Sequence, residues 1–280
     1  MFFYKVFQPS PALQPYIYNY SIVENNYAVM HNIMPRAAFI LGILYKGSME
    51  LETSGGQSMA AGFTSGVMGI QDAYRTFYKA PGTGMLAVNF TPTGAAALLP
   101  LPLQELFNQA CTLDNLFKRQ LVAGLEERVA GAKDTAGRIR ETESFLLQMI
   151  KGPQQDPLVY AGVKAIQRAK GIIKAEELAK ALFISPGRLE KRFKKTVGAT
   201  PKKFASLVRI AAVLKEVPSG KSLTALAYDA GYFDQPHFIH DFRHYTGYSP
   251  KQLLPHTCGQ PPCGFVYGSA TIPLPVNNPV

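Results

Sequence analysis

The chain has 280 residues, of which 47% are apolar and 17% charged, and its net charge at neutral pH is +10. This is the composition of a globular protein long enough for two domains, and it excludes extensive disorder. No apolar run approaches the roughly 20 residues of a membrane-spanning helix, and the first residues lack the pattern of a signal peptide, so we expect a cytoplasmic protein with no membrane partner.

Residues 1–91 consist of short apolar or aromatic segments bounded by Gly, Pro or Ser, which is typical of strands and turns. The clearest of these segments are residues 37–47, 66–71, 73–80 and 84–90. Short strands at regular spacing predict a β-barrel or a β-sandwich.

From Pro92 onward the pattern favours helices, which we expect to be short at 93–99 and 103–110 and longer at 115–131 and 135–150. We therefore predict an α+β protein of two domains, with a β-rich first domain and its helices spanning residues 1–150.

The polar stretch 151–157, broken by two prolines, is a linker candidate. A helical domain over 158–255 follows, and the tail 256–280, rich in Gly and Pro and without charged residues, is expected to be irregular. Two apolar pieces of this tail, FVYG and ATIPLPV, could instead dock as extended strands.

The positive charge is confined to one third of the chain. Residues 157–255 hold 17 Lys and Arg against seven Asp and Glu, whereas the rest of the chain holds 12 of each sign (29 − 17 and 19 − 7). Such asymmetry indicates a polyanionic partner for this third alone.

A helix-turn-helix pattern occupies residues 174–201. Ser185 is an N-cap candidate with Pro186 at the first helical position, and Gly198 is placed to end the helix. Apolar residues recur at helical spacing along the expected buried stripe, at Leu189, Phe193 and Val197. The opposite face is basic, as expected of a helix that enters the major groove of DNA.

The same layout returns at residues 222–250. Ala230-Gly231 supplies a tight turn, Asp234 is expected to cap the next helix, and Gly247 to end it. The buried pair is Phe238 and Phe242, and the exposed face presents Gln235, His237, His240 and either Arg243 or His244.

A linking helix over 202–217 is expected to hold the two units rigidly side by side. Its apolar stripe is Phe204, Val208, Ala211 and Ala212. Two rigidly joined units can reach successive major-groove segments on one face of a duplex.

This ordered pattern resembles the AraC/XylS family of bacterial regulators. The matching residues in the first unit are Ala179, Leu182, Ile184, Ser185, Leu189, Phe193, Lys194, Gly198 and Pro201. Those in the second unit are Leu226, Ala227, Ala230, Gly231, Tyr232, Asp234, Gln235, His237, Phe238, Phe242, Gly247, Ser249 and Pro250.

The resemblance implies a sequence-specific transcription regulator and the residues that touch DNA. The residues expected to reach bases are Arg188, Glu190, Lys191, Gln235, His237 and His240. Two further family positions are Gly187 and Pro236 here, which are poor donors, so direct readout rests on fewer side chains. The residues expected to reach phosphates are Ser185, Arg192, Lys194, Lys195 and Arg243.

The resemblance also implies a regulatory N-terminal half, commonly a cupin-like barrel followed by helices that form a homodimer. Two segments, beginning at Gln8 and Leu86, are similar to a less characterised N-terminal domain found on such regulators. A small-molecule effector and RNA polymerase are the further partners implied. Candidate effector contacts are Arg36, Tyr74 and Arg75, from cations and an aromatic ring available in this half.

The sequence has too few histidines and cysteines, and none of the motifs, for the common kinds of active site. We therefore expect no catalytic residue, no metal and no cofactor. His31 is the one histidine before residue 157, Cys111 stands alone, and no nucleophile or phosphate-binding motif occurs. Cys258 and Cys263 in the tail are too few for a metal site. The alternative function is a DNA-binding or scaffold protein without sequence preference.

Overall fold

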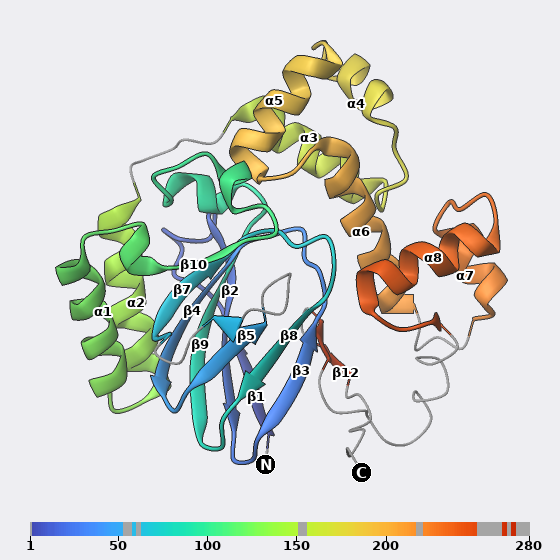
Figure 1. The fold of residues 1–280 in the computed structure, drawn as a ribbon. Coiled ribbons are helices and arrows are strands. Elements are labelled where there is room, and N and C mark those ends of the chain that lie inside the picture. The colour runs from blue at the N-terminus through green and yellow to red at the C-terminus, as the bar shows by residue number, and fades with distance from the viewer. Residues whose placement is uncertain are drawn as a thin grey trace.

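The structure, a computed structural model, describes residues 2–52, 58–59, 63–150, 156–216, 221–250, 265–267 and 270–272. Two antiparallel sheets form the N-terminal half, and the smaller lies across one face of the larger (Figure 1). The larger sheet has the order β1 (Phe2–Phe7), β2 (Ile17–Asn25), β9 (Thr83–Phe90), β4 (Ile40–Lys46), β7 (Ser65–Met68) and β10 (Ala110–Thr112). The smaller has the order β3 (Val29–Ile33), β8 (Arg75–Lys79), β5 (Met49–Glu52) and β6 (Ser58–Met59).

The burial of the strands follows from their place in the sheets. All eight residues of β9 are buried because this strand lies between β2 and β4 and is covered on both faces. In β8 the pattern alternates, with Phe77 and Lys79 buried and Tyr78 exposed between them. Since side chains alternate across a strand, Phe77 and Lys79 share the face that looks toward the larger sheet.

The predicted helices of the N-terminal half are present, but the short ones are single 3₁₀ turns: η1 (Gly94–Ala97), η2 (Leu103–Leu106) and η3 (Leu113–Asn115). The turn η3 ends at Asn115, where the sequence predicted a longer helix to start, and α1 (Arg119–Gly131) begins four residues later than expected. Helices α1 and α2 (Thr135–Met149) pack on each other, and α1 contacts β4.

Buried polar contacts fasten these two helices to the sheet. Ser65 on β7 donates a hydrogen bond to Glu126 on α1 at 2.5 Å. Tyr20 on β2 donates to Glu143 on α2 at 3.1 Å, and the backbone N–H of Ser10 donates to the same carboxylate at 2.8 Å.

The described residues of the C-terminal half form six helices: α3 (Pro157–Arg168), α4 (Ala175–Ala181), α5 (Pro186–Val197), α6 (Pro201–Glu216), α7 (Leu223–Asp229) and α8 (Gln235–Thr246). An antiparallel-sheet domain followed by a helical helix-turn-helix region confirms the predicted two-domain α+β class.

Three expectations need correction. Residues 156–157 of the predicted linker begin α3, because the Asp156 carboxylate accepts from the backbone N–H groups of Leu158 and Val159 and Pro157 takes the first helical position. Residues 151–155 of that linker lie outside the described residues, as do 251–255 of the predicted DNA-binding domain.

The linking helix α6 is covered on more than one side. Of its predicted stripe, Phe204 is fully buried, while Val208, Ala211 and Ala212 are only partly so. The residues that sequence periodicity missed, and that α6 buries, are Ala205, Leu207, Ile210, Val213 and Leu214.

The tail departs from the expected irregular structure in six residues. β11 (Phe265–Tyr267) and β12 (Ala270–Ile272) pair as antiparallel strands, in keeping with their β-branched and aromatic residues. Cys258 and Cys263 lie outside the described residues. No helix in the described part of the chain has the length and apolar character needed to cross a membrane.

Candidate nucleic-acid interface

The first helix-turn-helix unit is α4, a tight turn and α5. The turn closes when the backbone N–H of Ile184 bonds the Ala179 carbonyl at 3.1 Å, with Phe183 in the left-handed region at φ 53°. Ser185 occupies the predicted N-cap position, but its side chain makes no capping hydrogen bond. Gly198 ends α5 at φ 85°, as predicted.

The second unit has the same arrangement, but with a glycine at the left-handed turn position and a side chain that caps the recognition helix. Gly231 takes the left-handed position at φ 70°, and the N–H of Tyr232 bonds the Ala227 carbonyl at 3.0 Å. The Asp234 carboxylate caps α8 by accepting from the N–H of His237 at 2.8 Å. Gly247 ends the helix at φ 77°. The caps predicted from the sequence are therefore confirmed at Asp234, Gly198 and Gly247.

Each recognition helix buries one face and exposes the other. The predicted core residues Leu189, Phe193, Phe238 and Phe242 are all buried. The residues expected to touch bases are exposed on α5 and α8: Arg188, Glu190, Lys191, Gln235, His237 and His240. Of those expected to touch phosphates, Ser185, Lys195 and Arg243 are exposed, whereas Arg192 and Lys194 are half-buried.

Several of these side chains have acidic partners within the chain. Lys194 Nζ lies 2.7 Å from Glu190 Oε1, one helical turn away. Arg192 Nε lies 2.6 Å from Asp156 Oδ2, which ties α5 to the start of α3. These pairs are partly exposed, so exchanging a carboxylate for a DNA phosphate costs little.

Asp241 is a shared acceptor on α8 that sequence reasoning missed. Its carboxylate lies 3.7 Å from both His237 Nε2 and His240 Nδ1 and accepts a hydrogen bond from the Tyr232 hydroxyl at 3.2 Å. The helical spacing of His237 and Asp241 could have revealed the first of these contacts. Both imidazoles therefore lie near one carboxylate beside the exposed face.

The turns also carry aromatic side chains that the sequence did not single out. Phe183 is 98% exposed and Phe233 is 99% exposed, one beside the start of each recognition helix. Phe183 occupies the turn position that Gly231 occupies in the second unit. An aromatic residue at a position where the other unit has glycine could have pointed to Phe183 from the sequence.

The two units are held together through α6 and the α3–α4 connection. The Arg209 guanidinium on α6 lies 4.5 Å from the centre of the Tyr232 ring. A Cβ built at Gly231 would lie 2.9 Å from Ile172. The expected rigid link therefore has specific contacts on both sides of the second turn.

The C-terminal ends of both recognition helices lie against the N-terminal half (Figure 1). A Cβ at Gly198 would come within 3.0 Å of the Leu103 carbonyl and the Phe39 ring, and one at Gly247 within 2.7 Å of the Tyr74 ring. Glycine is thus needed at both positions for close approach as well as for positive φ.

An ion pair closes this contact. Lys203 Nζ on α6 lies 2.9 Å from Asp72 Oδ2 in the loop before β8. The other oxygen of Asp72 accepts from the Asn108 amide at 2.8 Å, and Asn108 accepts in return from the Asp72 N–H.

Both charges of this pair are stabilised by the contact. Burial is the largest single influence and opposes the charge on each group. The hydrogen bond and charge attraction between them, with the Asn108 bond to Asp72 and further charges nearby, together outweigh it, so the pKa of Asp72 is lowered and that of Lys203 is raised.

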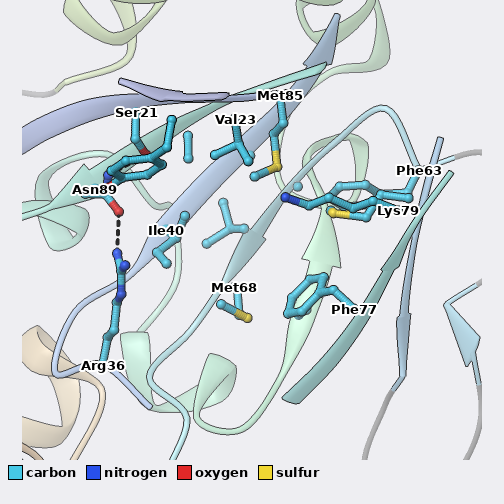
Figure 2. A pocket seen from close by; sticks show the side chains of 17 residues that line it. Ser21, Val23, Arg36, Ile40, Phe63, Met68, Phe77, Lys79, Met85 and Asn89 are labelled. Carbon is cyan, nitrogen blue, oxygen red and sulfur yellow. Dashed lines mark hydrogen bonds between the residues drawn. The ribbon is translucent and has the colours of Figure 1, made fainter. Parts of the chain in front are cut away.

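The three effector candidates are not brought together. Arg36 lines a cavity of about 90 Å³ between the sheets and donates to Asn89 Oδ1 at 2.8 Å (Figure 2). Arg75 donates to Gln71 and to the Asn108 carbonyl and lines only a smaller cavity of about 10 Å³ next to Arg36. Tyr74 contacts the DNA-binding half instead.

Two protein-family models match the chain. Residues 178–255 match a helix-turn-helix domain, and residues 5–112 match a domain of unknown function, DUF6597. No curated protein sequence matches.

Solved structures of regulators are also similar. ToxT from Vibrio cholerae shows 10% identity and a TM-score of 0.48 over 92% of this chain and 99% of ToxT. The C-terminal domain of AraT, a response regulator from Geobacillus stearothermophilus, shows 23% identity and a TM-score of 0.35 over 36% of this chain and 87% of that domain. A probable AraC family transcriptional regulator from Rhodopseudomonas palustris shows 25% identity and a TM-score of 0.34 over 36% of this chain and 98% of its own.

The matched helix-turn-helix residues run from α4 to the end of α8 and beyond, so they include both units and the exposed faces described above. Residues 178–255 of this chain therefore belong to a helix-turn-helix domain family, and this match supports the resemblance to AraC/XylS regulators that the sequence predicts.

Proposed function

We propose that the chain recognises a specific duplex sequence by placing the N-terminal halves of α5 and α8 in successive major grooves. The observation that carries this proposal is the shared design of the two helices. Each has 12 residues and an exposed start, at residues 186–188 and 235–237, and each ends at a glycine that rests on the rest of the protein. The ends that would read bases are therefore exposed while the opposite ends are held.

Within this proposal the exposed residues divide into two roles. Arg188 and Lys191 on α5, and Gln235, His237 and His240 on α8, offer donors suited to base edges, and Glu190 offers an acceptor. Ser185, Arg192, Lys194, Lys195 and Arg243 neutralise or bond phosphates along the same faces.

Selection of binding sites from random duplexes by the full chain tests specificity. We expect a defined site spanning two helical turns, and uniform enrichment would favour the alternative, DNA binding without sequence preference. Lys191→Ala or Gln235→Ala should cost roughly 1–3 kcal/mol of discrimination at particular base pairs.

Lys195→Ala should instead weaken binding to all sequences alike and reduce the salt slope by about 1. Arg119→Ala, which removes a charge from the exposed surface of α1, is the matched control and should leave both quantities unchanged. Equal loss from all four variants at every sequence would contradict the division of roles.

We further propose that the N-terminal half is a cupin-like, non-catalytic effector domain that works in a homodimer and that the bound protein contacts RNA polymerase. Leu121 on α1 and Leu147 on α2 are large apolar side chains left exposed, which supports a dimer contact on these helices.

The state of Cys111 supports a non-catalytic role for this half. Burial, and secondarily Asp114, raises the pKa of the Cys111 thiol, whereas an activated nucleophile needs a lowered pKa.

Regulation would reach DNA through the contacts between the halves. The loop at Asp72–Arg75 touches α6 through Lys203 and α8 through Gly247, and Arg75 borders the same small cavity as Arg36. A ligand that moves this loop would shift both recognition helices together. Sedimentation of the full chain and DNA binding with and without candidate ligands test the dimer and the response.

A further inference from the structure

The cavity between the two sheets is apolar except at two places. Its walls come from both sheets and are made mostly of methionine, phenylalanine and aliphatic side chains. One polar edge is formed by Ser21, Arg36 and Asn89, and the other polar group is Lys79, whose ammonium points into the cavity between Met85 and Phe77 (Figure 2).

The first polar edge is satisfied within the protein. The Asn89 amide donates to Asn19 at 2.8 Å and to Ser21 at 3.2 Å, and its oxygen accepts from Arg36 at 2.8 Å. A ligand therefore gains little by replacing these bonds.

Lys79 is in the opposite situation. Its side chain is only 4% exposed, and among the described residues it makes no ion pair or side-chain hydrogen bond. None of the described residues that line the cavity is acidic. Burial alone lowers the pKa of Lys79 to about 8, so the amine still carries its charge at neutral pH, without a counter-ion.

An uncompensated charge inside a protein is costly, and such groups are normally paired. β8 could bury a Met or Leu at this position at no such cost, because Phe77 two residues before is already apolar and buried on the same face. A cation kept there without a partner indicates that the partner is a ligand.

We propose that this cavity binds a small carboxylate with an apolar body, the carboxylate against Lys79 and the apolar body among Met49, Met85 and Phe77. This proposal rests on the proposed effector function and names the ligand class. A single ammonium matches the single charge of a monocarboxylate, and the mostly apolar walls offer few hydrogen bonds for a polyhydroxylated molecule.

The size of the cavity limits the ligand. Its volume of about 90 Å³ exceeds the ~10–15 Å³ needed for one water and is below the ~150 Å³ of a cavity that holds benzene. Acids of about three or four carbons match this volume, and longer ones, up to about eight carbons, enter only if the flexible methionine side chains move.

The test is calorimetric titration of the full chain with straight-chain carboxylates from propanoate to octanoate, with pentanamide as the neutral isostere of pentanoate. We expect at least one acid of the series to bind, and pentanoate to bind at least tenfold more tightly than pentanamide. Lys79→Met should weaken pentanoate binding at least tenfold, and Lys133→Met, a change at an exposed lysine in the same half, should not.

Equal affinity for pentanoate and pentanamide, unchanged affinity in Lys79→Met, or no binding by any acid of the series would overturn the proposal. So would labelling of Lys79 by pentanal and borohydride when no acid binds, because that result assigns the lysine to imine formation with a carbonyl ligand. Thermal unfolding of Lys79→Met shows that the variant is folded, so a loss of binding is not a loss of structure.

The ligand site and the effector function fail separately. If pentanoate binds but DNA affinity does not change, the ligand site is supported and the proposed effector response is contradicted. If DNA binding responds to another class of ligand and no carboxylate binds, the effector function is supported and the carboxylate site is contradicted.

Discussion

Phe183 has a backbone conformation that an aromatic residue rarely adopts. Its φ of 53° is in the left-handed region, and its side chain, 98% exposed, gains no burial in return. The equivalent position of the second unit is Gly231, for which this conformation is unstrained. The strain is thus a property of one residue, since the turn itself is common to both units.

Phe183→Gly should therefore raise the free energy of unfolding by about 1 kcal/mol, because it removes the steric cost of the left-handed region. Urea unfolding followed by far-UV circular dichroism measures the change. Gly231→Ala should do the reverse, since it adds that cost and brings a Cβ within 2.9 Å of Ile172. A less stable Phe183→Gly protein would show that the exposed ring makes a contact that stabilises the turn.

Lys79 gives a pH-dependent prediction. The folded pKa of about 8 is below the ordinary 10.5, so the unfolded chain binds the proton more tightly and stability rises as pH increases from 8 to 10.5. Below pH 8 the full cost is present, on the order of 3 kcal/mol for a buried group with this shift.

Lys79→Met should thus stabilise the ligand-free protein most near neutral pH, and its advantage should shrink above pH 8. Arg36 is the other cationic side chain among the described residues that line the cavity, and it is bonded to Asn89. Unfolding measured at several pH values, with Lys133→Met alongside, checks the window. A constant advantage at all pH values would mean that packing, and not charge, explains it.

At the scale of an element, the recognition helices show how much of a helix can be predicted from the residues at its two ends and along its buried face. Pro186 at the first position of α5, Asp234 as the cap of α8, Gly at each end and apolar residues four apart predicted the two helices, because these signals act within a few residues of each other. The N-cap of α5 is the exception, since Ser185 has the right position and backbone without the capping bond.

Asp234→Ala should therefore destabilise the protein by about 1 kcal/mol through loss of the cap on α8. Ser185→Ala should cost less, because no capping bond is lost from α5. Paired urea unfolding of the two variants measures the difference. Equal costs would show that Ser185 caps α5 in solution.

At the scale of the molecule, the contact of Lys203 with Asp72 joins the two halves. Asn108 supports this contact by donating a hydrogen bond to the same carboxylate, and Gly198 and Gly247 support it by their close approach to the N-terminal half. Because Asp72 has a lowered pKa, its contribution is complete above the ordinary pKa of aspartate and is lost as the pH falls through the lowered value.

Breaking this ion pair should lower DNA affinity about fivefold, corresponding to roughly 1 kcal/mol, because the recognition helices lose part of their pre-arrangement. Asp72→Asn is the informative variant. Electrostatics alone predicts tighter DNA binding when an acidic group is removed, whereas loss of the contact predicts weaker binding. The double variant with Lys203→Met should be no worse than the worse single one, and additive effects would contradict a shared contact.

The sequence by itself determined the class, the order of the elements, the two helix-turn-helix units and the faces that these expose. Those features depend on short-range rules: the period of apolar residues, caps, glycine conformation and the place of the charge. It did not determine the 3₁₀ turns before α1, the burial of α6 on more than one side or the pairing of β11 with β12.

Only the tertiary structure decided which residues far apart in the chain meet. Arg36, Tyr74 and Arg75 look alike in the sequence as possible ligand contacts. In the structure Arg36 lines the large cavity, Tyr74 touches the DNA-binding half, and Arg75 bonds Gln71 and the Asn108 carbonyl. Lys79 looked like an ordinary strand lysine, and its burial without a partner arises from the smaller sheet facing the larger one. Such contacts are set by how two sheets and two domains pack, and no period or spacing along the chain records that packing.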